Sequence, residues 1–151
     1  MKQAERLIRA GIPAVSTSGT SPALPVPRVQ VDNRRCGALA AEHLLGCGFA
    51  RFASLGQRGF AWSDLRESGF ADALAARDRC VTPYPENLLL EDPISRWRTA
   101  REPRRLSSWL AAQDRPLALF CANTGLALLA VEAARLAGLR IPEELALIAV
   151  G

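Results

Sequence analysis

The chain has 151 residues, enough for one ordinary domain and too few for two full ones. Apolar residues make up 49% of it and charged residues 23%, a composition typical of soluble globular proteins and unlike that of disordered chains. No apolar run approaches the roughly 18 residues of a membrane span, and the charged start Met1–Arg6 lacks the apolar core of a secretory signal, so we expect a cytoplasmic protein without membrane contact.

The first part of the chain alternates helical and extended patterns around a loop. A helix closes at Ala10 and Gly11, and Ile12–Val15 has the pattern of a strand. Residues 16–27 are rich in Ser, Gly, Thr and Pro, which predicts a loop, and Arg28–Val31 alternates like a strand. A helix capped by Asp32 or Asn33 then runs to about Leu45. We expect its apolar side to hold Cys36, Leu39, Ala40, Leu44 and Cys47.

The remainder repeats strand and helix patterns at short intervals. Ser63 is expected to cap a helix that runs to about Ala76, and residues 83–93 allow no assignment. The other expected strands are Arg51–Gly56, a segment near Cys80–Thr82, Leu117–Cys121 and Leu145–Val150, and the other expected helices are Glu102–Gln113 and Ala127–Ala137. This alternation predicts an α/β fold, a mainly parallel sheet with helices on both faces. A strand pattern that runs to the last residue suggests that the chain is a piece of a larger protein.

Basic residues and cysteines do not indicate a site. The net charge is +4, and the densest basic cluster, which we interpret as a solvated face rather than a phosphate-binding stripe, is Arg96, Arg98, Arg101, Arg104 and Arg105. The four cysteines, Cys36, Cys47, Cys80 and Cys121, are far apart and without the spacing of zinc ligands, and the single histidine is His43. We therefore expect buried, reduced thiols, no metal and no cofactor.

Candidate binding residues follow the expected strands, because ligands of open parallel sheets sit at the carboxyl ends of strands. Arg66 lies in the first turn of its helix, where the helix dipole disfavours a cation, and such a guanidinium can donate two hydrogen bonds to vicinal hydroxyls. The alternative is a surface ion pair with Asp64 or Asp32. Asn123 ends a strand and can donate to and accept from a hydroxyl, or it can cap the next helix.

Aromatic side chains lie near these positions. Trp62 and Phe60 share the loop that leads to Arg66, and Trp97 is placed less well. An aromatic face can bind the apolar face of a sugar ring, although covering the sheet edge is the simpler role.

Catalytic patterns are missing from the sequence. One histidine excludes most histidine relays, and neither the nucleophile-elbow pattern nor the phosphate-binding loop pattern occurs. The carboxylates Asp64, Glu67 and Asp72 are expected to be solvated, so an enzyme is the poorer interpretation.

Several motifs, in order, resemble lactose/galactose-repressor-type transcriptional regulators over residues 5–151. They are Val31–Arg34 followed by Gly37–Leu45, the R-x-x-G-F helix Leu65–Phe70, Phe120–Asn123, and the closing run Ala137–Gly151. Gly59–Ser63 and Arg105–Leu110 most resemble xylose-operon regulators. Thr124 departs from the family, which usually has Asp there.

The resemblance implies two Rossmann-like lobes of the periplasmic-binding-protein-like type that close on a small sugar. Residues 1–31 would be the tail of the first lobe and one hinge crossing, and residues 32–151 the second lobe. The family's ligand-binding arginine and asparagine would correspond to Arg66 and Asn123, with Trp62 or Trp97 stacking on the sugar. The expected partners are a sugar effector, DNA through a domain outside this chain, and a second copy in a homodimer; the alternative is a periplasmic sugar-binding protein of a transporter.

Overall fold

The computed structural model describes residues 2–17, 25–86, 88 and 102–151. The chain divides into two compact units, Met1–Asp32 and Asn33–Gly151. Trp97, one of the expected binding residues, lies outside the described residues.

In the first unit, helix α1 (Lys2–Arg9) is followed by a turn that contains Gly11, whose φ of 69° suits glycine. The strands expected at Ile12–Val15 and Arg28–Val31 are wrong, because a single parallel bridge, Ser16 to Arg28, is the only pairing described there. Val29 and Val31 are 64% and 62% exposed, so these side chains gain little from an extended conformation.

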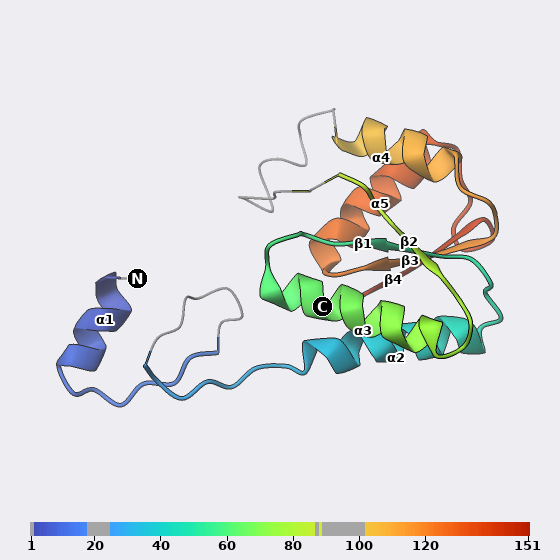
Figure 1. Cartoon of the computed structure of the whole chain (residues 1–151). Coiled ribbons are helices and arrows are strands. Elements are labelled where there is room, and N and C mark those ends of the chain that lie inside the picture. The colour runs from blue at the N-terminus through green and yellow to red at the C-terminus, as the bar shows by residue number, and fades with distance from the viewer. Residues whose placement is uncertain (1, 18–24, 87, 89–101) are drawn as a thin grey trace. The chain divides into compact units, whose positions relative to one another are not determined.

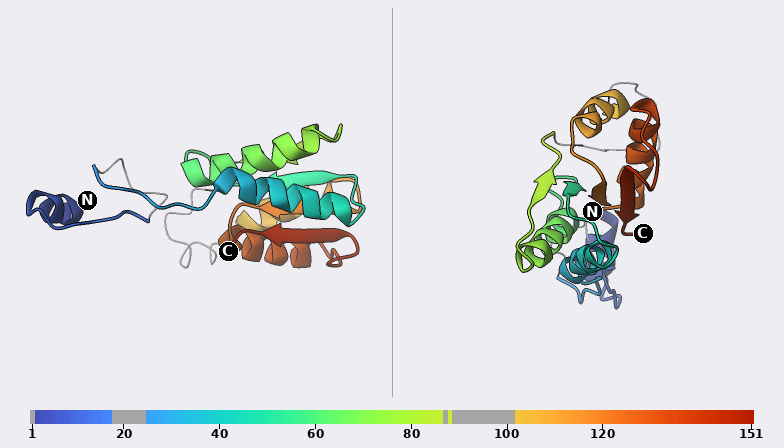
Figure 2. Two further views of the ribbon diagram at one scale, coloured as in Figure 1. Left: turned by 90° about the horizontal axis from the view of Figure 1, so that it is seen from below. Right: turned by 90° about the vertical axis from the view of Figure 1, so that its right-hand side faces the viewer.

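The second unit confirms the predicted α/β fold. Its parallel sheet has the strand order β2-β1-β3-β4, formed by β1 (Phe52–Leu55), β2 (Val81–Pro83), β3 (Leu117–Cys121) and β4 (Leu145–Ala149). Helices α2 (Asn33–Gly46) and α3 (Ala61–Ala75) cover one face, and α4 (Glu102–Ala111) and α5 (Thr124–Leu136) cover the other (Figures 1 and 2). Each helix follows a strand or precedes one, as the sequence pattern predicts.

Strand β3 is buried on both sides and separates two hydrophobic cores. Leu117, Leu119 and Cys121 point to the core beneath α4 and α5. Ala118 and Phe120 alternate with them and point to the core beneath α2 and α3, where the rings of Phe70 and Phe120 stack 4.7 Å apart. A strand with both faces buried reads as a continuous apolar run, which is why the sequence identifies it readily.

Helices α2 and α3 approach each other through their backbones. A Cβ atom on Gly37 would lie 1.9 Å from the carbonyl oxygen of Arg66, and one on Gly69 would lie 1.9 Å from the carbonyl oxygen of Arg34. The two glycines thus permit a contact that any side chain would prevent.

This contact corrects the expected apolar side of α2. Ala40 and Leu44 are buried as expected and Cys36 is half-buried, but Leu39 is 49% exposed and Cys47 is also exposed, so the prediction is wrong for these two residues. The buried residues are Asn33, Gly37, Ala40, Ala41 and Leu44. Small residues face α3 because the helices are too close for larger ones, and hydrophobicity alone does not reveal that requirement.

Two helix starts also differ from expectation. The N-cap of α3 is Phe60, so the prediction that Ser63 caps this helix is wrong; Ser63 lies inside α3, fully buried, and its hydroxyl accepts a hydrogen bond from the Gln57 backbone at 2.8 Å. Helix α5 begins at Thr124 rather than Ala127, because the Asn123 side chain caps it.

All four cysteines are free. Cys121 is buried as expected and Cys36 is half-buried, but burial is wrong for Cys47 and Cys80, which are exposed. Over the residues that the structure covers, no three His, Cys, Asp or Glu side chains converge as metal ligands, and no helix is long and apolar enough to cross a membrane.

Glu67 corrects the prediction that the α3 carboxylates are solvated. Its Oε1 accepts a hydrogen bond from the Ser54 hydroxyl of β1 at 2.7 Å, and its Oε2 would lie 1.8 Å from a Cβ on Gly56. Burial is the main cause that raises the pKa of the Glu67 carboxyl, and the bond from Ser54 opposes it. The absence of a side chain at Gly56 therefore lets α3 bond to the central sheet.

Replacing Gly69 by alanine should lower the free energy of unfolding by about 1–3 kcal/mol, because the new methyl group must push α2 from α3. Urea denaturation measures this change. Gly46→Ala in the same helix pair is the matched control, since a Cβ there meets open space, and it should be neutral or gain up to about 1 kcal/mol. Equal stability of the two variants would contradict the close helix contact.

Glu67→Gln should stabilise the protein at pH 7. A carboxyl whose pKa is raised by folding stabilises the fold when protonated, below its unfolded pKa, and that stabilisation is lost as the pH rises through the folded pKa. Glutamine keeps the acceptor for Ser54 without the charge, so the difference should shrink toward pH 4. The pKa of the exposed Glu132 is lowered, chiefly by its hydrogen bond from Arg135, so Glu132→Gln should show no gain at pH 7. Urea denaturation of both variants from pH 4 to 8 tests this prediction. If the stability of Glu67→Gln changes with pH as that of Glu132→Gln does, the raised pKa of the Glu67 carboxyl is contradicted.

Candidate functional site

The candidate site lies within the second unit, where the adjacent strands β1 and β3 end. Gln57 follows β1 after one glycine, and Ala122 and Asn123 follow β3 directly. The first two turns of α3 bring Trp62 and Arg66 to the same edge. Because α3 begins at Ala61, Arg66 is in the second turn of the helix, and the expectation that it lies in the first turn is wrong. Parallel strands all end at this edge, so residues from distant parts of the sequence meet there.

Arg66 is held from two sides. Its Nε donates to Asn33 Oδ1 at 2.8 Å and its Nη1 donates to the Ala122 carbonyl at 2.6 Å. Partial burial is the main cause that lowers the pKa of its guanidinium, and the nearby Cys36 opposes this shift. The side chain stays charged at physiological pH, because a guanidinium is effectively always protonated in proteins.

One edge of this guanidinium remains available. The group carries five N–H donors, and Nη2 makes no hydrogen bond with any residue that the structure describes. Its carbon lies 5.3 Å from the centre of the Trp62 ring, a cation–π distance. The alternative of an ion pair with Asp64 is not what the structure has, since the hydrogen bonds go to Asn33 and Ala122.

Asn123 has a structural role that sequence reasoning left open. Its Oδ1 accepts from the Leu126 backbone at 2.8 Å, so it caps α5. Its Nδ2 donates to Gln57 Oε1 at 3.0 Å, and Gln57 Nε2 in turn donates to the Leu88 carbonyl at 3.2 Å. The asparagine is therefore fixed in orientation by α5 and by the segment after β1.

The aromatic residues at the start of α3 also meet at this edge. The rings of Phe60 and Trp62 lie 6.1 Å apart with planes inclined at 45°. Trp62 is half-buried and packs against the core beneath α4 and α5. The structure brings together Phe60, Trp62, Arg66 and Asn123, while Trp97 is not described.

Sequence reasoning missed the residues that hold the site in place. Gln57 is only 5% exposed and Asn33 only 9%, and both are buried polar side chains with partners in the site. A polar residue directly after a predicted strand was the available signal for Gln57. Asn33 was expected only as a helix cap, because nothing in the local pattern reveals a partner 33 residues later.

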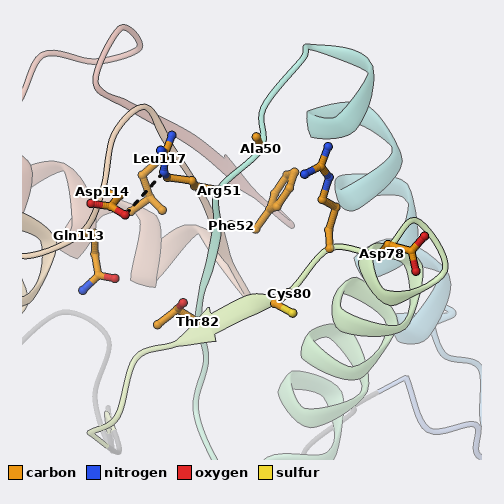
Figure 3. A pocket seen from close by; sticks show the side chains of 10 residues that line it. Ala50, Arg51, Phe52, Asp78, Cys80, Thr82, Gln113, Asp114 and Leu117 are labelled. Atoms are coloured by element: carbon orange, nitrogen blue, oxygen red, sulfur yellow. Dashed lines mark ion pairs between the residues drawn. The ribbon is translucent and has the colours of Figure 1, made fainter.

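A pocket of about 300 Å³ lies at the opposite edge, near the amino ends of β1 and β3 (Figure 3). Arg51, Thr82, Gln113 and Asp114 contribute to its lining. The Arg51 guanidinium lies 3.8 Å from the Asp114 carboxylate and donates to the Arg115 carbonyl at 3.1 Å. The charges of Arg51 and Asp114 are thus paired with each other, so this pocket is a weaker candidate than the edge that holds Arg66.

Comparison with known proteins places this architecture in a family. Residues 41–151 match the periplasmic binding protein-like domain. Among curated proteins, the HTH-type transcriptional regulator DegA of Bacillus subtilis (strain 168) is 30% identical over 149 residues, which cover 98% of this chain and 42% of DegA. The chain thus spans less than half the length of the curated relatives it matches, and these relatives are regulators rather than enzymes.

Solved structures agree on the fold. The xylose-binding transcription activator XylR superposes with a TM-score of 0.78 at 25% identity, covering 100% of this chain and 40% of that one. A LacI family transcriptional regulator from Enterococcus faecium with bound ribose superposes with a TM-score of 0.74 at 21% identity, covering 97% of this chain and 52% of that one. The predicted resemblance to lactose/galactose-repressor-type regulators is confirmed, and the chain belongs to the periplasmic binding protein-like domain family.

Proposed function

We propose that this chain is part of the effector-sensing domain of a transcriptional regulator and that its second unit binds one side of a small sugar. The observation that carries the proposal is the Nη2 edge of Arg66, held in place by Asn33 and Ala122 and left without a hydrogen bond among the described residues. Residues 32–151 would form one lobe around the sugar, and residues 1–31 would belong to the other lobe and one hinge crossing.

The chemistry of this edge suits a monosaccharide. A planar guanidinium can donate two parallel hydrogen bonds to vicinal hydroxyls, and a fixed asparagine amide can serve a third. The Trp62 ring supplies an aromatic face beside the charge. Since XylR is described as xylose-binding and the Enterococcus regulator holds ribose, a pentose is the class to test first.

Regulation would follow from a shift between conformations. A sugar that binds the closed lobes more tightly than the open ones moves the population toward the closed state, by no more than that difference in affinity. DNA contact would come from a domain outside this chain, and a homodimer would couple sugar binding to DNA contact. The curated relatives favour this role over a transporter's binding protein. The adjoining sequence distinguishes them, since a regulator carries a helix-turn-helix and an exported protein a signal peptide.

Arg66→Lys should weaken sugar binding by about 10- to 100-fold, the loss expected when a charge-assisted hydrogen bond worth about 1.5–3 kcal/mol is removed. A lysine ammonium is a point charge that cannot contact Asn33 and Ala122 and also present a flat edge to the ligand. Tryptophan fluorescence titrated with xylose, arabinose, ribose, glucose and galactose gives the dissociation constants.

Arg77→Lys is the matched control, because Arg77 is exposed just beyond the far end of α3. It should bind sugar as the unaltered chain does. If both variants keep the original affinity while a sugar still binds, the sugar site lies elsewhere.

A further inference from the structure

Two metal-ligating side chains lie at the exposed carboxyl end of α2, His43 in its last turn and Cys47 directly after Gly46. His43 and Cys47 are one helical turn apart, and Cys47 Sγ lies 3.7 Å from His43 Nε2. Both side chains are exposed, and the thiol is free. Neither residue belongs to the edge that holds Arg66, so their proximity has no part in the proposed sugar site.

The distance between these two atoms fits a tetrahedral metal ion. Zn²⁺ binds thiolate sulfur at about 2.3 Å and imidazole nitrogen at about 2.0–2.1 Å, and the tetrahedral angle then separates the two donor atoms by about 3.6 Å. The observed separation of 3.7 Å therefore needs little side-chain movement to accept an ion.

The backbone beneath the pair is fixed by the fold. Ala40, Ala41 and Leu44 bury the opposite side of α2 in the core. The Cys47 amide bonds to the His43 carbonyl at 3.0 Å, and Gly48, with φ of 86°, ends the helix. The carboxyl end of a helix carries partial negative charge, which favours a cation there.

We propose that His43 and Cys47 form a two-ligand site for a borderline-soft divalent cation such as Zn²⁺. The remaining coordination positions are open to water, since no third His, Cys, Asp or Glu joins the pair within the described ranges. Binding replaces the thiol proton, which passes to solvent, with a sulfur–metal bond, and the neutral imidazole supplies the second bond. The ion thereby links the side chains of His43 and Cys47 across one helical turn.

Co²⁺ is the spectroscopic probe for this site, added to the full chain with its thiols kept reduced by a phosphine. We expect one Co²⁺ per chain and a near-ultraviolet thiolate-to-cobalt absorption band that Zn²⁺ abolishes by displacement. Cys47→Ser should remove the band. His43→Gln should weaken Co²⁺ binding by about 10²-fold or more, because the second ligand binds at high effective concentration.

Cys80→Ser is the matched control, since Cys80 is the other exposed thiol and the sequence has no second histidine to pair with it. It should keep the band and the affinity. Loss of the band in Cys80→Ser, unchanged affinity in His43→Gln, or no band in the unaltered chain would each overturn the proposal. Circular dichroism of each variant measures whether the helices remain. We expect them to remain, because the side chains of His43 and Cys47 are both exposed.

Discussion

Helices α2 and α3 touch through their backbones, and the candidate site depends on that contact. A Cβ on Gly37 would meet the carbonyl oxygen of Arg66, so the residue that presents the guanidinium lies at the helix contact itself. Asn33, one turn before Gly37 on the same buried side of α2, accepts the hydrogen bond from Arg66 Nε. Two glycines therefore position both the charged side chain and the group that orients it.

The sheet supplies the other half of the site. Strand β3 is fixed by two cores, and the Ala122 carbonyl directly after it accepts from Arg66 Nη1. Asn123 caps α5 and bonds to Gln57, which joins the ends of β3 and β1. A binding edge supported by strand ends and helix starts is more precisely placed than one on loops alone, which suits recognition of hydroxyl groups at defined positions.

Much of this arrangement could be predicted from the sequence, and the exceptions have physical causes. The apolar runs of β1, β3 and β4, and the positions of Arg66 and Asn123 after strands, follow from local pattern. The buried side of α2 was predicted only in part, at Ala40 and Leu44, because the rest of it is set by the distance to α3. Ser63 and Glu67 bond to partners across a turn or distant in sequence, so Ser63 was expected as a helix cap and Glu67 as a solvated carboxylate. Gln57 was missed because its partner Asn123 is distant in sequence. The strands expected before Asp32 failed because nothing described in that unit buries their valines.

Chemical shifts of the ¹⁵N-labelled chain titrated with pentoses test the central claim most directly, since they detect weak binding and locate it. We predict shifts concentrated at the side-chain N–H groups of Trp62, Arg66 and Asn123, and their loss in Arg66→Lys but not in Arg77→Lys. Sugar-induced shifts that cluster away from the ends of β1 and β3, or that persist unchanged in Arg66→Lys, would contradict the account.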